Sequence, residues 1–263
     1  MNKLLVFQDL QDFWDYAFRE STAYKKSSRK LKSEWNGDLS WSGAKNMALR
    51  GWQEGFLKVQ EFQVKISPLI TNKIVKTVNE YAVCGGSVDI GMFLANDPEC
   101  FVSKSYGEES REGKIITLVC SLSFSAAISP ETIIQRGAMI CALVDAIEYA
   151  GYRVEVICND TSSDNSNGWF EIDVVVKKAN QPLNLIEMAF CLAHPAMLRR
   201  MMFSVAEIEG WSDYASYYGT PDVATNKGAL YIQEIYSGMI SDAMAIDWVL
   251  SELEKLGIKI EKK

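Results

Sequence analysis

Near the middle of the 263-residue chain stands the run Lys114-Ile115-Ile116-Thr117-Leu118-Val119-Cys120. Its β-branched and apolar side chains follow one another almost without polar alternation, the pattern of a β-strand that is covered on both faces. Ser129-Pro130-Glu131 then predicts the start of a helix, with a capping serine, a proline in the first turn and an acid behind it. This helix is apolar almost throughout and ends at Gly151. We therefore expect it to lie against a sheet.

Further elements extend this unit towards the C-terminus. Residues 153–158 and 169–176 predict two more strands, separated by the polar loop 159–168, and residues 183–208 predict a long helix that is interrupted near Pro195. Strand, helix and strand in this order favour a right-handed crossover between parallel strands. The sequence thus predicts an α/β fold: an open, mostly parallel, Rossmann-like sheet with helices on both faces.

The N-terminal part of the chain predicts helices. Residues 9–24 have the apolar spacing of an amphipathic helix, and residues 41–63 predict a second one. That second helix either ends near Gly51 or is closely packed there, since glycine costs about 1 kcal/mol inside a helix. Residues 68–81 predict a third helix. We divide the chain into a helical region, residues 1–81, which packs on an α/β core domain, residues 82–263.

Two smaller features complete the expected organisation. Asn96-Asp97-Pro98-Glu99 has the composition of a turn that precedes a strand, although its acids, together with Asp89, also suggest metal ligands. At the C-terminal end, residues 241–256 predict a last amphipathic helix, and residues 258–260 predict a short edge strand.

Composition limits the class of protein. The chain has 27 basic and 34 acidic side chains, a formal net charge of −7, and 48% hydrophobic residues, which excludes a disordered chain. No stretch reaches the roughly 18 to 20 apolar residues of a membrane span, so we expect no membrane partner. Only four apolar residues lie between Lys3 and Gln8, too few for a signal peptide. We expect a cytoplasmic protein.

Cysteine and histidine residues predict structural roles. The six cysteines form no Cys-x-x-Cys pair, and several end apolar runs, so we interpret them as reduced, buried side chains. The single histidine, His194, precedes Pro195. We interpret it as a packed or capping residue at a helix break, with a catalytic base as the alternative.

Polar side chains follow the first two strands of the core, where an open parallel sheet binds ligands. The residues are Ser121, Ser123, Ser125, Asp160 and Asp164. This arrangement resembles the von Willebrand factor A domain, in which a buried strand ends in Asp-x-Ser-x-Ser and helps to hold a divalent cation. Ser123 and Ser125 match the two serines, whereas Ser121 replaces the aspartate. Because a hydroxyl does not offset the desolvation of a hard cation, we assign no metal or cofactor, and the resemblance leaves a divalent cation as the alternative.

Two other surfaces are candidates for binding. The first is an aromatic loop that can receive a partner, stack bases or cover the core; it consists of Trp211, Tyr214, Tyr217 and Tyr218. The second is a basic run that can contact phosphate or form a solvated linker; it consists of Lys25, Lys26, Arg29, Lys30 and Lys32.

Three blocks carry a second resemblance. They are Trp41-Ser42-Gly43 with the stretch to Gly55, the stretch from Asp89 to Cys100, and His194-Pro195-Ala196-Met197-Leu198-Arg199-Arg200. Together they look like an uncharacterised family encoded by bacteriophages and related mobile elements. The resemblance implies a phage origin and the cytoplasm of an infected host cell, and it implies no activity.

We favour a non-catalytic phage protein that binds another protein, of phage or host, through the strand-end surface or the aromatic loop. One alternative is a magnesium-dependent enzyme of nucleic acids or nucleotides that gathers Asp89, Asp97, Glu99, Asp160 and Asp164. A second alternative is a nucleic-acid-binding factor that uses residues 25–32 with Arg199 and Arg200, which the charge of −7 opposes. The chain has no glycine-rich phosphate loop, dinucleotide fingerprint or nucleophile elbow.

Overall fold

The computed structural model describes residues 1–70, 75–108, 115–149, 151–164, 168–233 and 242–256. Its main sheet is mixed and has the strand order β1-β7-β6-β5-β9, with β8 paired to the end of β6. The strands are β1 (Asn2–Phe7), β5 (Ile115–Ser121), β6 (Arg153–Ser163), β7 (Trp169–Lys177), β8 (Thr220–Pro221) and β9 (Leu230–Ile232).

Connections between the strands explain their directions. The long helix α5 (Pro130–Tyr149) links β5 to β6, and a crossover of this kind makes the two strands parallel. A short connection joins β6 to β7, and this pair is antiparallel. The pairs β1–β7 and β5–β9 are both parallel. The structure therefore confirms the predicted α/β class and the mostly parallel sheet.

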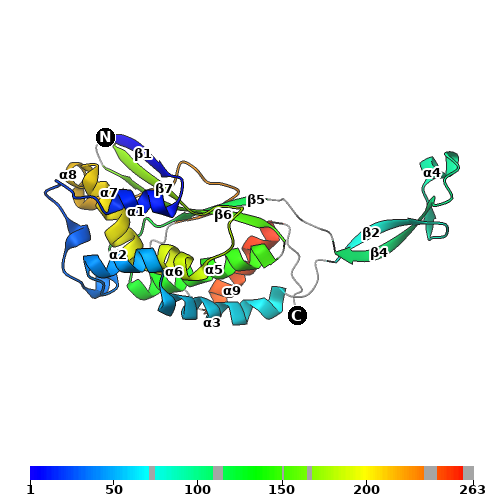
Figure 1. Cartoon of the computed structure of the whole chain (residues 1–263), viewed down its shortest axis with the longest axis horizontal. Coiled ribbons are helices and arrows are strands. Elements are labelled where there is room, and N and C mark those ends of the chain that lie inside the picture. Colours follow the sequence, from blue (N-terminus) through cyan, green and yellow to red (C-terminus); the bar gives the residue numbers. More distant parts are fainter. Residues whose placement is uncertain (71–74, 109–114, 150, 165–167, 234–241, 257–263) are drawn as a thin grey trace.

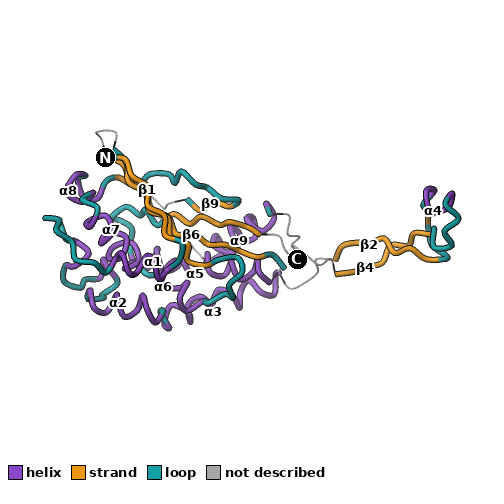
Figure 2. The backbone as a smooth tube through the Cα atoms, turned by 45° about the horizontal axis from the view of Figure 1, so that its top comes forward, coloured by secondary structure: helices purple, strands orange, loops and turns teal. Residues whose placement is uncertain are grey.

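Apart from α4 (Ile90–Leu94), which lies away from the main sheet, the described helices gather on one side of that sheet (Figure 1), and the rotated view agrees (Figure 2). Besides α5 they are α1 (Leu10–Ala17), α2 (Trp41–Arg50), α3 (Gln53–Ile70), α6 (Leu185–Ala193), a π-helix (Met197–Met202), α7 (Phe203–Ile208), α8 (Trp211–Tyr214) and α9 (Asp242–Lys255), with three short 3-10 turns, η1 (Ser27–Arg29), η2 (Glu34–Asn36) and η4 (Ser216–Tyr218).

The two faces of the sheet are covered differently. Leu118 and Val156 point into the large core that the helices complete. Val119 and Ile157 point to the other face, where they form a small cluster with Ala224 from the segment between β8 and β9. We expected helices on both faces. A loop takes the place of the second helical layer, because much of that face is polar and leaves little apolar area for a helix to bury.

Both expected helix interruptions are present. Gly51 ends α2 with φ of +78°, and a Cβ atom there would lie 2.9 Å from the backbone oxygen of Ile186. The helix thus ends at this glycine and is also closely packed there. Further along, α6 ends at Ala193, and the π-helix and α7 follow the break at Pro195.

The prediction of a helix over residues 68–81 is wrong from Val75 onward, and residues 71–74 lie outside the described part of the chain. Residues 75–82 form the strand β2 (Val75–Ala82), which pairs antiparallel with β4 (Phe101–Glu108). The strand expected after the turn at 96–99 is β4. At the far end lie β3 (Ser87–Val88) and α4 (Ile90–Leu94). We call residues 75–108 the arm, and Figure 1 shows that it projects away from the body of the molecule.

The structure refines the expected division of the chain. The boundary between residues 81 and 82 falls inside the arm, at the end of β2. Residues 2–7 form β1 at the edge of the main sheet. The last helix, α9, lies close to its expected position, whereas the edge strand expected at 258–260 lies outside the described residues.

Candidate binding site at the strand ends

A cavity of about 490 Å³ opens at the carboxyl ends of β5 and β6. This volume is in the range of small-molecule sites. The lining comes from four separate parts of the chain: Ser27, Lys30 and Trp35; Ser123, Phe124, Ser125 and Ala126; Asp160, Thr161 and Ser162; and Leu198, Arg199, Phe203, Tyr217, Tyr218, Gly219, Thr220 and Pro221. Members of the predicted strand-end group, the aromatic loop and the basic run thus meet around one cavity.

Asp160 is a buried carboxyl in the cavity wall. Its Oδ1 atom accepts a hydrogen bond from Ser123 Oγ at 3.0 Å, and Ser123 Oγ accepts from the backbone N–H of Thr161 at 2.7 Å. Within the described part of the chain, no group donates to Asp160 Oδ2. Burial raises the pKa of Asp160 to about 6, and the bond from Ser123 opposes that shift.

The other strand-end residues have different surroundings. Ser125 lines the cavity with Ser123. Ser121 is fully buried at the end of β5, where its Oγ atom accepts from the backbone N–H of Ser123. Asp164 lies in the β6–β7 hairpin, its N–H bonded to the carbonyl of Gly168, and it is not part of the lining. The structure therefore brings three of the five predicted residues to the cavity.

The aromatic loop is divided between core and cavity. Trp211 is completely buried and donates from Nε1 to Ser162 Oγ at 2.9 Å. Tyr214 stacks on Trp211. Tyr218 stacks on Phe203 with 4.1 Å between ring centroids and donates its hydroxyl to Glu207 at 2.6 Å. Burial, together with Glu207, raises the pKa of Tyr218.

Tyr217 differs from its neighbours because its side chain is 92% exposed while it lines the cavity. Its φ is +52°, and that of Tyr218 is +72°. Two consecutive non-glycine residues in the left-handed region store backbone strain, which is often found at ligand sites.

Backbone contacts hold the basic run to the body of the molecule. The buried Glu207 accepts from both the N–H and the hydroxyl of Ser28, and Asp213 accepts from the N–H of Lys25. The guanidinium of Arg29 lies over the Trp41 ring. The side chains of Lys26, Lys30 and Lys32 are exposed, and Lys30 is the lysine of this run that lines the cavity.

Arg199 and Arg200 are buried on the π-helix and bind backbone carbonyls. Arg200 donates to Ser28, Lys30 and Leu39, and so holds residues 28–39 against the body. Arg199 donates to Ile128 at 2.8 Å and to Trp35. Burial lowers the pKa of Arg199 to about 10, so its guanidinium stays charged at neutral pH. Both guanidinium groups are engaged inside the protein, which removes them from the phosphate-binding surface that we had considered.

His194 and the cysteines have structural surroundings. Nδ1 of His194 accepts from the N–H of Ala196 at 3.0 Å, and its ring packs against Trp52 and Phe190. Burial lowers the pKa of His194 to about 4. All six cysteines are free thiols, and all except Cys84 are buried.

The carboxylates considered for a magnesium enzyme do not come together. Asp89, Asp97 and Glu99 lie on the arm, where Asp89 Oδ1 caps α4 by accepting from Gly91 and Met92. Asp160 lies in the body. Over the described residues, no three histidine, cysteine or acidic side chains are placed to hold a metal ion.

Sequence analysis missed a buried polar cluster on the loop-covered face of the sheet. Asn159 Nδ2 donates to Glu171 Oε1 at 3.0 Å and to Asp173 Oδ1 at 2.7 Å, and Thr225 donates twice to Glu171. Burial raises the pKa of Asp173 to about 6, and Glu171 adds to the rise. The available signal was the presence of acids at alternate positions of an otherwise apolar strand.

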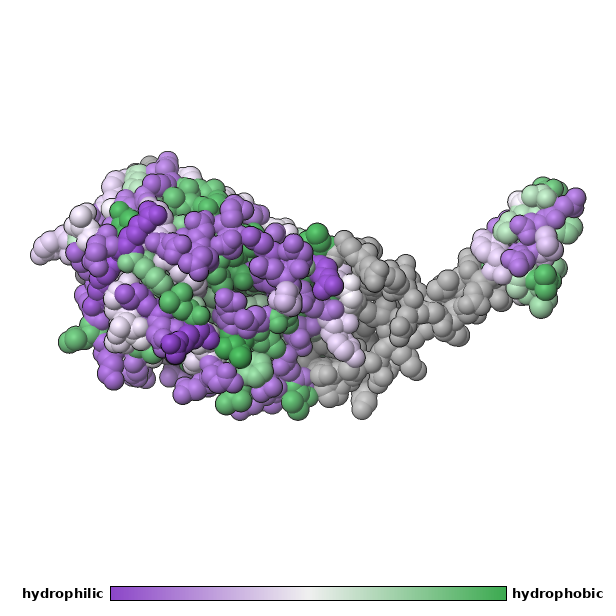
Figure 3. Space-filling model, viewed as in Figure 1, coloured by the Kyte–Doolittle hydropathy of each residue, from purple (hydrophilic) through white to green (hydrophobic). Residues whose placement is uncertain are grey.

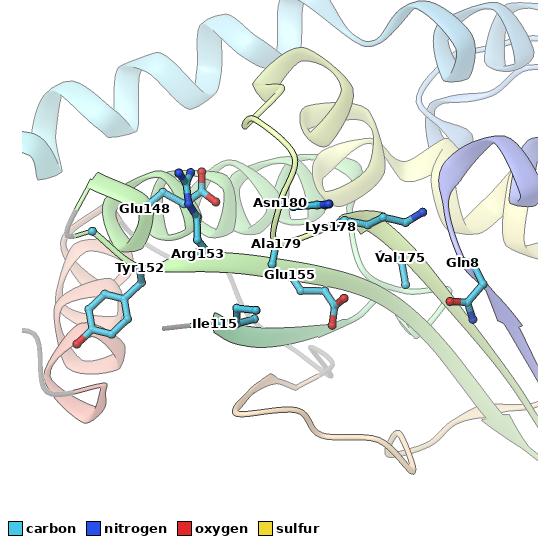
Figure 4. A pocket seen from close by; sticks show the side chains of 11 residues that line it. Gln8, Ile115, Glu148, Tyr152, Arg153, Glu155, Val175, Lys178, Ala179 and Asn180 are labelled. Carbon is cyan, nitrogen blue, oxygen red and sulfur yellow. The ribbon is translucent and has the colours of Figure 1, made fainter. Parts of the chain in front are cut away.

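A second hollow, of about 940 Å³, lies at the opposite ends of the same strands. Figure 4 shows Tyr152 and Gln8 at its two ends, with the charged residues Glu148, Arg153 and Lys178 spread between them. Glu148 is paired with Lys177 at 2.6 Å. The polar groups do not converge on one point, so the strand-end cavity is the better candidate for a specific ligand site.

The tip of the arm, residues 83–99, is the other unusual surface. Large apolar side chains are exposed there, and Figure 3 shows hydrophobic residues at the end of the arm. They are Val83, Val88, Ile90, Phe93 and Leu94. The sequence predicts a turn in part of this segment, and its periodicity does not reveal that the apolar side chains there lack a core.

Comparisons with known proteins give a family. Within the described residues, no helix has the length and apolarity that crossing a bilayer requires. Neither a curated protein nor a solved structure matches the chain. A family described as "Domain of unknown function (DUF7192)" matches residues 2–260. Because this match covers nearly the whole chain, the protein belongs to that uncharacterised family.

Proposed function

We propose that the protein is a non-catalytic interaction module and that the tip of its arm binds another protein. The observation that supports this proposal is the exposure of Ile90, Phe93 and Leu94, whose side chains are 72%, 60% and 77% exposed. All three belong to one five-residue helix at the end of the projecting arm (Figure 1).

Exposure of this kind is costly without a partner. A hairpin with two main strands buries too little apolar surface to form a core of its own. Contiguous apolar patches on a protein surface mark interaction sites, and covering them yields about 25 cal/mol per Å² of apolar area. A partner that encloses α4 therefore gains most of its binding energy from Phe93 and its neighbours, as large side chains at the centre of an interface do.

Charge at the tip indicates the chemistry of the partner. Residues 77–103 contain no lysine, arginine or histidine, whereas Asp97 and Glu99 lie beside α4 in the sequence. Both acids are exposed. The complementary surface is an apolar groove with a basic rim, because opposite charges around an apolar centre favour encounter and correct registration.

The resemblance of three sequence blocks to proteins of bacteriophages and mobile elements supports a proposal about where the protein acts. On this proposal the protein is encoded by a bacteriophage and acts in the cytoplasm of the infected host cell, with a phage or host protein as its partner. The von Willebrand A-like arrangement of strand-end residues is compatible with an assembly role, but that inference is by analogy of fold alone.

The test compares two aspartate substitutions in affinity purification from infected cells. Phe93→Asp places a charge at the centre of the tip, and Tyr149→Asp does the same at a side chain that is 71% exposed on the body. We expect the wild type and Tyr149→Asp to recover the same stoichiometric partner, and Phe93→Asp to recover at least tenfold less. Equal recovery by both variants contradicts the proposal. If light scattering shows that the wild type self-associates and that Phe93→Asp does not, the partner is a second copy of this chain rather than a foreign protein.

A further inference from the structure

We infer that the strand-end cavity binds a planar heteroaromatic ligand that carries amino donors, the chemistry of an amino-substituted nucleobase in a nucleoside monophosphate. This inference concerns a different surface from the arm and does not depend on the proposed protein partner. Three features of the cavity lead to it: a half-bonded carboxyl, a wall of aromatic rings and a positively charged side.

The carboxyl is Asp160. Ser123 donates to its Oδ1 atom, and within the described part of the chain Oδ2 has no donor. Oδ2 is not fully enclosed by protein, so an N–H donor from a ligand in the cavity can reach this oxygen and replace solvent as its partner. An ionised carboxylate only accepts hydrogen bonds, which selects ligands that present N–H groups over ligands that present carbonyl oxygens.

Aromatic rings supply the wall for a flat ligand. Trp35 and Phe203 line the cavity with their ring centroids 6.2 Å apart, and Phe203 stacks on Tyr218. Tyr217 adds a fourth ring, which is exposed and held in a left-handed conformation. An exposed ring on a strained backbone has no function in packing, whereas stacking on a flat ligand gives it one.

Two positively charged side chains line the same cavity. Lys30 is exposed and lines it, and the buried guanidinium of Arg199 stands over the Trp35 ring at 4.7 Å. Among the described residues, Arg199 has no acidic partner and uses its donors on two backbone carbonyls. The donors of Arg199 are thus used inside the protein, whereas the exposed ammonium group of Lys30 can pair with an anionic group on the ligand. This extends the class from the free base to its phosphorylated nucleoside.

The first experiment is calorimetric titration of the full chain with adenosine, guanosine, cytidine and uridine 5′-monophosphates. Among these, the uracil ring has no exocyclic amine, and its one N–H donor, at N3, lies between two carbonyl oxygens that an ionised carboxylate repels. We expect at least one amino-bearing nucleotide to bind at least tenfold more tightly than the uridine nucleotide. In Asp160→Asn, whose amide donates as well as accepts, this preference should fall below threefold. No binding of any of the four at millimolar concentration, or an unchanged preference in Asp160→Asn, overturns the inference.

Two matched pairs of variants separate cavity binding from surface binding. Ala126→Trp fills the cavity from its exposed rim, whereas Ala127→Trp changes an exposed neighbour that does not line it. We expect the first to abolish binding and the second to leave it unchanged. Lys30→Gln should weaken the monophosphate about tenfold and the unphosphorylated nucleoside less than twofold, and Lys32→Gln should affect neither. Equal effects within both pairs mean that the nucleotide binds elsewhere, which overturns the assignment.

Discussion

Single residues at the strand ends lower the stability of the folded state, and the rest of the fold offsets this loss of free energy. Asp160 is ionised above a pKa of about 6 although it is buried, and Tyr217 and Tyr218 hold left-handed backbone angles. Neither feature improves packing, because Tyr217 is exposed and Asp160 has a single protein donor among the described residues. Local costs of this type are typical of sites kept for binding.

Asp160→Asn should stabilise the protein, and the gain should depend on pH. The folded-state pKa lies above the unfolded value of 3.8, so the folded state holds the extra proton between about pH 4 and 6. The contribution of the Asp160 carboxyl to the free energy of unfolding is therefore most favourable below pH 4, where the group is protonated. It is lost as pH rises through 6, where the buried group ionises. Because one pKa unit corresponds to about 1.4 kcal/mol, we expect Asp160→Asn to gain about 2 to 3 kcal/mol at pH 7.5 and almost nothing at pH 4.

Urea unfolding of both proteins at the two pH values measures this difference. Asp97→Asn, which alters an exposed carboxyl on the arm, is the control and should change stability by less than about 0.5 kcal/mol at either pH. A gain in Asp160→Asn that is the same at pH 4 and pH 7.5 would show that the buried charge is not its source.

Tyr217→Asn should also stabilise the protein. Asparagine tolerates the left-handed region better than tyrosine, and the exposed ring gives up little packing. We expect a gain of about 0.5 to 1 kcal/mol in thermal or urea unfolding. A loss of stability would mean that the Tyr217 ring contributes more to packing than its exposure indicates.

Helices and strands were predictable where local pattern and tertiary context agree. The run from Ile115 to Cys120 and the capped start at Ser129-Pro130 both lead to elements that the structure confirms. β2 was not predictable, because it pairs with β4 across a separation of 19 (Ala82 with Phe101) to 33 residues (Val75 with Glu108), and strand pairing outweighs a helical pattern there. The edge strand β1 was missed for the same reason, since it pairs with β7, which begins at Trp169.

The cavity shows a further limit of sequence analysis. Ser123 and Asp160 were expected at one sheet edge because parallel strands end together. The addition of Trp35, Phe203 and Tyr217 depends on how the basic run is held by Glu207 and Arg200. No spacing in the sequence encodes that arrangement.

Close contact between α5 and α6 gives a prediction at the scale of elements. A Cβ atom on Gly137 would lie 2.2 Å from the Cα atom of Ala193 and 2.3 Å from the carbonyl oxygen of Leu192. Gly137→Ala must therefore push the helices apart, and overpacking of this kind costs about 1 to 3 kcal/mol or more. Gly86→Ala, where a Cβ meets nothing within 4 Å, is the matched control. If thermal unfolding shows equal stability for both variants, the two helices are not in close contact.

At the scale of the whole molecule, the protein has a body, with a cavity at its strand ends, and an arm that projects from that body (Figures 1 and 3). The strands of the arm pair with one another, and the large core is built mainly by the body. The exposed apolar tip thus contributes little to the stability of the fold, which leaves partner binding as its function in our account.

The most direct test is photo-crosslinking in infected cells from single positions. A photoreactive amino acid at position 93 reports on the arm tip, and the same group at position 149 reports on the exposed end of α5 in the body. The account predicts one dominant crosslinked protein from position 93, competed away by the unlabelled wild type and not by Phe93→Asp, with no such product from position 149. Equal or absent crosslinking at the two positions would contradict the claim that the arm tip binds a protein partner.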